Sequence, residues 1–230
     1  MRSLLRQAAN AVAFFCPRCR RHSYRQFTYS QDGEDRHLLH FFEARRSGFF
    51  VDVGAFHPKQ YSNTYLFYEM GWRGINIDPA PGVAELFRRI RPLDVSLPAG
   101  IALESGEREF FVYDEPAYNT FSRESKEMMA RRGFPRLVEE RKVRVLPLAQ
   151  VLTENCPMGT EIDFLSVDAE GTDFDVLKSN DWDRFRPRVV LAENAASVDQ
   201  VLQAPATRFL AERGYELFAK TNLSAFYRRL

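Results

Sequence analysis

The sequence predicts an α/β fold: a mostly parallel sheet with helices on both faces, an inserted hairpin, and an antiparallel hairpin at the end of the chain. From Phe49 onward, short β-rich apolar runs alternate with helical segments, which is typical of a parallel sheet covered on both sides. The last two β-like runs, 215–219 and 224–228, are separated by the turn residues Thr221 and Asn222. With 230 residues, 45% of them hydrophobic, the chain is long enough for one sizeable domain.

The first repeating unit is a strand, a loop and a helix. Residues 48–54 are apolar and end in a glycine, which indicates a buried strand followed by a turn. Residues 62–70 predict a helix that Ser62 caps and Gly71 terminates.

A second unit of the same kind follows directly. Residues 74–78 predict a strand, and 79–81 (PAP) predict a turn. Apolar side chains then recur at the i, i+3, i+4, i+7 spacing of an amphipathic helix. The residues at this spacing are Val83, Leu86, Phe87 and Ile90.

The middle of the chain departs from this alternation. Runs 95–103 and 108–113 are β-like and flank a short polar segment, which predicts a hairpin inserted into or beside the sheet. Residues 114–140 contain polar and aromatic loop residues and a charged helix at 123–132, so we expect a lid or a substrate-facing insertion there. The remaining elements expected are strands at 142–146, 162–167 and 188–193, a helix near 174–178, and a helix pair interrupted at Pro205 and ended by Gly214.

Charge separates the first residues from the rest. The whole chain carries 32 basic and 31 acidic residues, so it has no global basic field, and we expect no nucleic-acid partner. The first 31 residues, however, contain six arginines and no acid. We therefore divide the chain into a basic N-terminal extension, 1–28, and one domain, 29–230.

The extension does not have the sequence of a membrane span. Its apolar stretch, 8–15, is far shorter than the ~20 residues that a spanning helix needs, and no secretory cleavage site follows it. We interpret it as a frayed basic arm and expect a cytoplasmic protein. A basic amphipathic helix that touches an anionic membrane surface and an organelle transit peptide are the alternatives.

The cysteine count is odd, which predicts a reducing compartment and no disulfide framework. Cys16 and Cys19 lie near His22 and offer three zinc ligands, whereas structural zinc sites usually need a fourth. The third cysteine, Cys156, is far away in the sequence. We therefore expect no metal.

Acidic residues end two neighbouring predicted strands. Ligands of an open parallel sheet bind outside the carboxyl ends of its strands. Asp52 offers a carboxylate to a cationic or NH-bearing group, and Gly54 allows the backbone to turn sharply and approach a ligand. Asp78 is placed to accept hydrogen bonds from both hydroxyls of a ribose. A plain structural turn at Asp52 and helix capping by Asp78 are the alternatives, but together the two acids favour an adenosine-containing ligand.

The same loop argues against a dinucleotide. A pyrophosphate site needs three glycines spaced G-x-G-x-x-G, whereas this loop has one glycine and contains Pro58. An adenosine-cofactor oxidoreductase is therefore disfavoured.

A third predicted strand ends in paired acids. Asp168 and Glu170 follow residues 164–167 and precede a glycine, a site that can hold a base or orient an acceptor hydroxyl. A metal site that also includes Glu193 or Asn194 is the alternative.

Five segments follow one another in register: 30–35 (SQDGED), 50–55 (FVDVGA), 62–64 (SNT), 71–79 (GWRGINIDP) and 163–171 (DFLSVDAEG). Together they resemble the FkbM-type methyltransferase family. That resemblance implies a Rossmann-like class I methyltransferase fold with a seven-stranded sheet, S-adenosyl-L-methionine as the methyl donor, and O-methylation, often of sugars in natural products or cell-surface polysaccharides. The family's acidic block usually continues with an acid shortly after its glycine, where this chain has Thr172 and Asp173.

The resemblance also implies roles for residues at the matched positions. It makes Asp52 and Gly54 the donor-binding turn, Asp78 the ribose acid, and 168–171 the acidic block. We expect the donor contacts to be Gln31, Asp52, Gly54, Ala55, Asn63, Asp78 and Asp168, with Glu34 folding over the same pocket.

A sugar hydroxyl has a high pKa, so its methylation benefits from a general base. The candidates are His57, Asp168 and Glu170, and the alternative role for His57 is to brace the donor loop. We expect contacts with a small-molecule or saccharide acceptor in the loop 118–120 (YNT). The alternative function is a regulatory module that binds S-adenosylmethionine or a nucleotide without catalysis.

Overall fold

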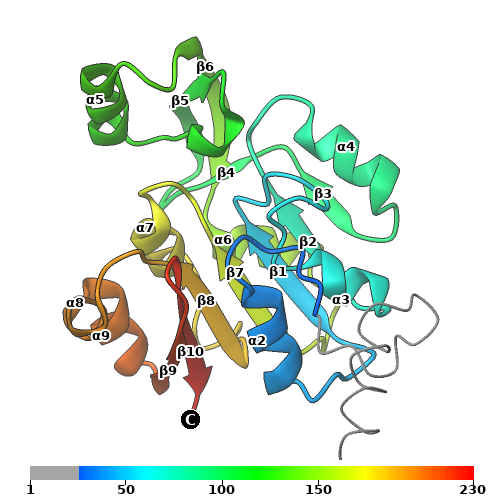
Figure 1. The fold of residues 1–230 in the computed structure, drawn as a ribbon. Helices are drawn as coiled ribbons and strands as arrows, with labels where there is room; N and C mark the ends of the chain where they lie inside the picture. The colour runs from blue at the N-terminus through cyan, green and yellow to red at the C-terminus, as the bar shows by residue number, and fades with distance from the viewer. Residues whose placement is uncertain (1–25) are drawn as a thin grey trace, which may run out of the picture.

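The computed structural model describes residues 26–230, and its centre is a twisted seven-stranded sheet with helices on both faces (Figure 1). The strand order is β3-β2-β1-β7-β8-β10-β9, and every pair from β3 to β8 is parallel. β10 is antiparallel to both of its neighbours, so the predicted fold class and its C-terminal hairpin are confirmed. The strands are β1 (Phe49–Val53), β2 (Arg73–Ile77), β3 (Val95–Leu97), β7 (Phe164–Val167), β8 (Val189–Glu193), β9 (Tyr215–Lys220) and β10 (Ser224–Arg229).

The strand order creates a switch point between β1 and β7. The chain runs outward from β1 to β3 and then returns to place β7 on the other side of β1. Loops that leave neighbouring strands in opposite directions open a crevice at their carboxyl ends. The topology therefore places the predicted strand-end acids around one crevice.

Two hydrophobic layers cover the sheet. Successive side chains of a strand point to opposite faces, so Val51 and Val53 of β1 belong to one layer and Phe50 to the other. The first layer includes side chains of α6, α7, α8 and α9, and the second includes side chains of α2 and α3. The helices of the main domain are α2 (Glu34–Phe41), α3 (Tyr65–Glu69), α4 (Val83–Ile90), α6 (Leu148–Asn155), α7 (Asp173–Lys178), α8 (Val198–Gln203) and α9 (Pro205–Ala211).

Helix α3 is shorter than the sequence predicts. It begins at Tyr65 with Thr64 as its N-cap, so the predicted first turn from Ser62 is wrong. The Ser62 hydroxyl instead accepts hydrogen bonds from the backbone N–H groups of Thr64 and Tyr65, at 3.3 and 3.1 Å. Such side-chain bonds to the nearby backbone compete with helix formation. By contrast, α4 spans the predicted helical residues.

The predicted hairpin between runs 95–103 and 108–113 is wrong. The first run supplies β3 to the main sheet and β4 to a second, three-stranded sheet of order β4-β6-β5. β5 pairs antiparallel with β6, which follows it only after a long connection. The pairing is non-local, and local β patterns do not reveal such partners. The elements of this region are β4 (Gly100–Ile101), β5 (Gly106–Tyr113), η2 (Pro116–Tyr118), α5 (Arg123–Arg132) and β6 (Leu137–Leu146).

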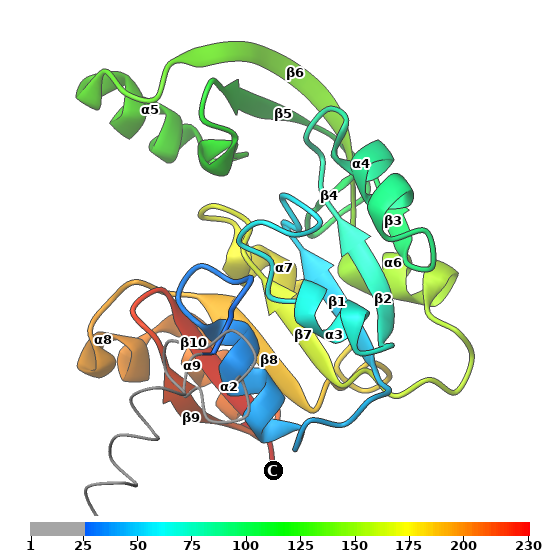
Figure 2. The same ribbon diagram turned by 45° about the vertical axis from the view of Figure 1, so that its right-hand side comes forward.

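Residues 100–146, which we name the insertion, project beyond the carboxyl ends of the main strands. Figure 2 shows β6 arching away from the sheet, with α5 at its far end. The Thr120 hydroxyl ties the insertion to the main domain by donating a hydrogen bond to the backbone carbonyl of Glu170, at 2.7 Å. The insertion thus stands next to the crevice, where a substrate-facing element was expected.

Trp72 stabilises the second layer. It is fully buried among Phe42, Phe67 and Phe164, and its indole N–H donates to the Arg45 carbonyl at 2.7 Å. We expect Trp72→Ala to lower the free energy of unfolding by about 3–5 kcal/mol, because the change leaves a large cavity. Urea denaturation measures this. The exposed Phe27→Ala is the control and should change stability by less than ~0.5 kcal/mol, and a similar loss in both variants would contradict the packing role.

Within residues 26–230, no helix is both long and apolar enough to cross a bilayer. The suggested zinc ligands Cys16, Cys19 and His22 lie outside the described residues, as does most of the basic extension. The domain boundary at 28/29 and the membrane contact of the extension therefore stay predictions.

Candidate active site

A cleft lies at the carboxyl ends of β1, β2 and β7, with the insertion forming part of its wall. The main domain contributes strand ends and the loop after β1, and the insertion contributes Phe110, Asn119 and Phe121. Of the site residues predicted from the sequence, the cleft is lined by Gln31, Asp52, Gly54, Ala55, Asn63, Asp78, Asp168 and Glu170.

Gly54 is the point of closest approach between two strand ends. It has φ +77°, and a Cβ placed on it would lie 1.7 Å from the backbone carbonyl oxygen of Asp168. Its N–H donates to the Ile77 carbonyl at 2.9 Å, which joins the loop to the end of β2. Only glycine fits this position, and its backbone is open to the cleft.

Asp52 is buried at the floor of the cleft. Its Oδ2 accepts a hydrogen bond from the Thr64 hydroxyl at 2.9 Å. Burial raises the pKa of Asp52, and the nearby charge of Arg91 opposes that shift. The carboxylate is therefore held in one orientation by α3 and its N-cap.

Asp78 is oriented by two backbone donors. Its Oδ2 accepts from the Phe56 N–H at 2.8 Å, and its Oδ1 accepts from the Ala80 N–H at 2.7 Å. Burial raises its pKa to about 6, and these two N–H groups oppose the shift. The N-cap of α4 is Gly82, so Asp78 does not cap that helix.

Four carboxyl groups cluster beside the end of β7: Asp168, Glu170 and Asp173 follow that strand, and Glu193 ends β8. Burial, together with the charges of Glu193 and Asp173, raises the pKa of Glu170 to about 8. The pKa of Asp168 is also raised well above its usual range, by burial and then by Glu193, and its Oδ1 is buried without a hydrogen-bond partner in the described structure. Asp173 accepts from the N–H groups of Ala169 and Gly171, which folds the loop back on itself.

The acidic cluster does not have the arrangement of a metal centre. Across residues 26–230, no group of three or more His, Cys, Asp or Glu side chains is placed to hold a metal ion. Burial and the mutual repulsion of these acids raise the pKa values of the carboxyl groups above their usual range.

Two predicted residues lie apart from the others. His57 is not part of the cleft lining, and its Nδ1 accepts hydrogen bonds from the N–H groups of Lys59 and Gln60, at 3.1 and 2.9 Å. Burial lowers its pKa. Glu34 likewise points elsewhere and accepts from the hydroxyls of Thr221 and Ser224 in the C-terminal hairpin. This geometry favours the bracing role for His57.

Of the loop 118–120, only Asn119 lines the cleft. Its side-chain oxygen accepts from the Tyr113 N–H at 2.8 Å. Tyr118 is outside the lining. Sequence reasoning missed Phe56 and Tyr61, which line the cleft from the donor-side loop, because isolated aromatics in a loop have no distinguishing pattern.

Comparison with known proteins gives one family. The model of the methyltransferase FkbM domain matches residues 52–217, which includes all three acidic strand ends. A search of curated proteins finds no match.

Solved structures of three methyltransferases are similar to the chain at low identity. A TehB-like SAM-dependent methyltransferase from Corynebacterium glutamicum is 13% identical, with a TM-score of 0.42 over 86% of this chain and 88% of that one. An O-methyltransferase from Bacillus cereus is 12% identical, with a TM-score of 0.43 over 96% and 86%. A precorrin-6y C5,15-methyltransferase from Geobacter metallireducens is 11% identical, with a TM-score of 0.36 over 84% of each chain.

Proposed function

The chain belongs to the FkbM methyltransferase family and is a SAM-dependent methyltransferase, and from that premise we propose that it methylates a hydroxyl oxygen of a sugar or another small polar, uncharged acceptor. The acceptor meets the donor in the cleft between the strand ends and the insertion. The observation that carries this proposal is the charge of the cleft. Its ionisable lining residues are Asp52, Asp78, Asp168, Glu170 and the phenol Tyr61, and within the described residues no Lys or Arg lines it.

The donor half of the cleft fits S-adenosylmethionine. Asp52 presents a carboxylate to the ammonium group, and Asp78 presents oxygens already aligned by two backbone N–H groups to the ribose hydroxyls. The glycine at position 54 leaves the backbone free for close approach. When bound, S-adenosylmethionine supplies a methyl group activated by its sulfonium.

The acceptor half is assigned to the acidic cluster. A hydroxyl loses its proton as its oxygen attacks, and Glu170 or Asp168 accepts that proton, since carboxylates of raised pKa are stronger bases once ionised. The main task of the remaining residues is alignment, because the leaving group is already activated. The insertion contributes by closing the acceptor side and lowering access of water.

Charge argues for the class of acceptor. A phosphate or carboxylate acceptor would find no Lys or Arg in the described lining to pair with its charge. A neutral polyol can instead donate hydrogen bonds to the carboxylates of the lining. The proposal therefore favours saccharides over nucleotides, acidic peptides and nucleic acids.

The direct test is methyl transfer from S-[methyl-³H]adenosylmethionine. The purified chain is incubated with a panel of neutral sugars, sugar phosphates, catechols and amines, and labelled products are separated by chromatography. The proposal expects label on a neutral hydroxyl compound and release of one S-adenosylhomocysteine per methyl transferred. Turnover of an amine or an anionic acceptor in preference to every neutral hydroxyl compound would contradict it.

Asp78→Ala tests the donor half. We expect the affinity for S-adenosylmethionine to fall about 10- to 100-fold, because one or two hydrogen bonds to a charged carboxylate are lost. Isothermal titration calorimetry measures the change. Asp78→Asn retains one acceptor oxygen, so its affinity for S-adenosylmethionine should lie between those of wild type and Asp78→Ala. Unchanged affinity in both variants would contradict the binding of the ribose by Asp78.

A further inference from the structure

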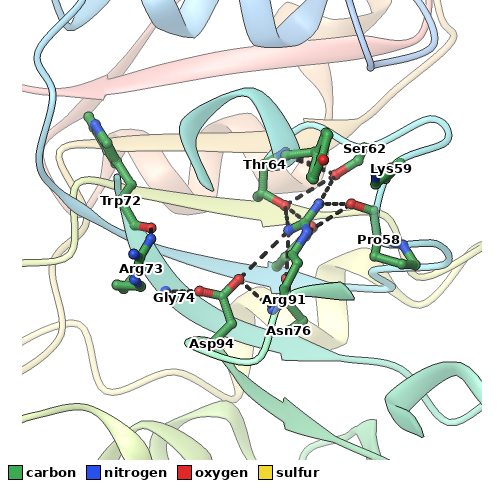
Figure 3. Close-up of polar contacts among 12 residues, drawn as sticks. Pro58, Lys59, Ser62, Thr64, Trp72, Arg73, Gly74, Asn76, Arg91 and Asp94 are labelled. Atoms are coloured by element: carbon green, nitrogen blue, oxygen red, sulfur yellow. Dashed lines mark hydrogen bonds and ion pairs between the residues drawn. The ribbon is translucent and has the colours of Figure 1, made fainter. Parts of the chain in front are cut away.

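Arg91 is a buried cation beneath the donor loop, which we define as residues 54–64. It follows α4 directly, as the C-cap, and is 0% exposed. Figure 3 shows its guanidinium directed toward the loop. It donates to the Pro58 carbonyl from two nitrogens, to the Ser62 hydroxyl at 2.7 Å and to the Thr64 hydroxyl at 2.8 Å.

The guanidinium is held from its other side as well. It donates to the Asn76 side-chain oxygen at 3.3 Å and forms an ion pair with Asp94 at 3.9 Å. The rings of Tyr65 and Phe87 lie against it, at 5.1 and 5.0 Å from its Cζ. Burial lowers its pKa to about 10, so Arg91 is charged at neutral pH. Because a buried charge is costly unless it is well paired, its environment is built around it.

The loop that Arg91 holds is strained at two places. Phe56 has φ 52° and Tyr61 has φ 53°, a conformation that non-glycine residues rarely adopt. Both side chains line the cleft, and their rings stack at 6.1 Å with an interplanar angle of 20°. Pro58 lies between these two residues and Ser62 directly follows the second, so the bonds from Arg91 act where the loop needs support.

The same guanidinium reaches the cleft floor through a relay. Arg91 donates to the Thr64 hydroxyl at 2.8 Å, and that hydroxyl donates to Asp52 Oδ2 at 2.9 Å. Because the Thr64 hydroxyl oxygen accepts from Arg91, its proton is free to be donated to the Asp52 carboxylate. Asp52 is therefore oriented by a cation that lies outside the cleft lining.

We propose that Arg91 is a positioning residue for donor binding: it holds the donor loop in its strained shape and, through Thr64, orients Asp52 toward the amino-acid end of S-adenosylmethionine. This inference rests on the proposed donor half of the cleft. Arg91 acts through its neighbours and touches neither donor nor acceptor. Lysine at this position keeps the charge but lacks the planar fork that serves the three acceptors of the donor loop at once.

The test compares two ligands by calorimetry. S-adenosylhomocysteine contains the amino-acid end, and 5′-methylthioadenosine lacks it, so the ratio of their affinities reports on Asp52. For Thr64→Val we expect that ratio to fall at least fivefold, with methylthioadenosine affinity within twofold of wild type. Thr64→Ser restores the hydroxyl and should restore the ratio. A role in fold stability alone would weaken both ligands together and leave the ratio unchanged.

Arg91→Lys removes the support of the whole loop. We expect affinity for S-adenosylhomocysteine to fall at least tenfold. Affinity for methylthioadenosine should fall less, since this ligand loses only the support of the aromatic wall, whereas S-adenosylhomocysteine also loses the orientation of Asp52. The matched control is Arg88→Lys, in the same helix and exposed, which should bind both ligands as wild type does. Thermal unfolding checks that each variant is folded. If Arg91→Lys does not fold, Thr64→Val and Thr64→Ser still test the proposal.

Three outcomes separate the hypotheses. If wild type binds neither ligand, the donor site of the proposed function is wrong. If wild type binds both and Thr64→Val leaves the affinity ratio unchanged, the relay to Asp52 is wrong. If folded Arg91→Lys binds like Arg88→Lys, the support of the loop by Arg91 is wrong, while the donor site itself is retained.

Discussion

Gly54→Ala is expected to abolish detectable binding of S-adenosylmethionine, with an affinity loss of at least about 100-fold. A methyl group at this position would lie 1.7 Å from the carbonyl oxygen of Asp168, which is backbone and cannot rotate away. The ends of β1 and β7 would have to separate, and this deforms the cleft that both line. In addition, the left-handed φ of 77° costs a non-glycine residue about 1–2 kcal/mol.

The control for Gly54→Ala is Gly159→Ala. Gly159 has nearly the same φ, +76°, but nothing lies within 4 Å of a Cβ placed on it. It carries the conformational cost without the collision, so calorimetric donor binding should match wild type. If both variants bind the donor alike, the close approach of the two strand ends has no role in the site.

Glu170→Gln is expected to reduce kcat about 100- to 10,000-fold, the range that loss of a general base produces. The amide is nearly the same size but cannot accept the acceptor's proton. Donor affinity should change little, because Glu170 is assigned to the acceptor half. Rates are measured with the acceptor found in the methyl-transfer screen, and Glu124→Gln, an exposed acid at the start of α5, is the control.

The pH dependence of the wild type follows from the pKa of Glu170, which burial and neighbouring acids raise to about 8. A base must be ionised, so kcat/KM should rise with pH up to about 8 and level off above it. In Glu170→Gln this limb should disappear. A wild-type profile that is already flat from pH 6 to 9 would contradict base catalysis by this group.

The stability of Glu170→Gln shows whether a lower kcat comes from loss of the base or from loss of the fold. The pKa of Glu170 is higher in the folded protein than its ordinary value of 4.5, so the folded state binds more protons between pH 4.5 and about 8. The contribution of this group to stability is therefore present below pH 4.5 and is lost as the pH rises through 8. Thermal unfolding at pH 8 should show Glu170→Gln to be at least as stable as wild type.

Local pattern was sufficient for most of the sheet. Alternating β-rich and helical runs predicted β1, β2, β7, β8 and the C-terminal hairpin, because strands that helices cover on both faces are rich in apolar residues. Strand ends with acids and a glycine predicted Asp52, Gly54, Asp78, Asp168 and Glu170, and the structure brings these residues to one cleft.

Pairing between distant segments was not predictable in this way. β5 and β6 are separated by η2 and α5, and the first half of β6 is too charged to have the pattern of a strand. Its residues 138–140 (VEE) are exposed because only one part of β6 packs on the main domain. The β5–β6 pairing of the insertion is therefore evident only in the tertiary structure.

The amino-acid sequence by itself determined the α/β class, the donor loop and the three acidic strand ends, since these depend on residue types at local spacings. Tertiary structure alone decided which groups act on one another. Arg91 ends the segment 88–91 (RRIR), which has the pattern of a solvated helix end. In the structure, however, it is fully buried and hydrogen-bonds to the donor loop. His57 looked like a base, yet the loop turns its Nδ1 toward two backbone N–H groups. Burial and partners belong to the folded chain, because segments far apart in the sequence supply them.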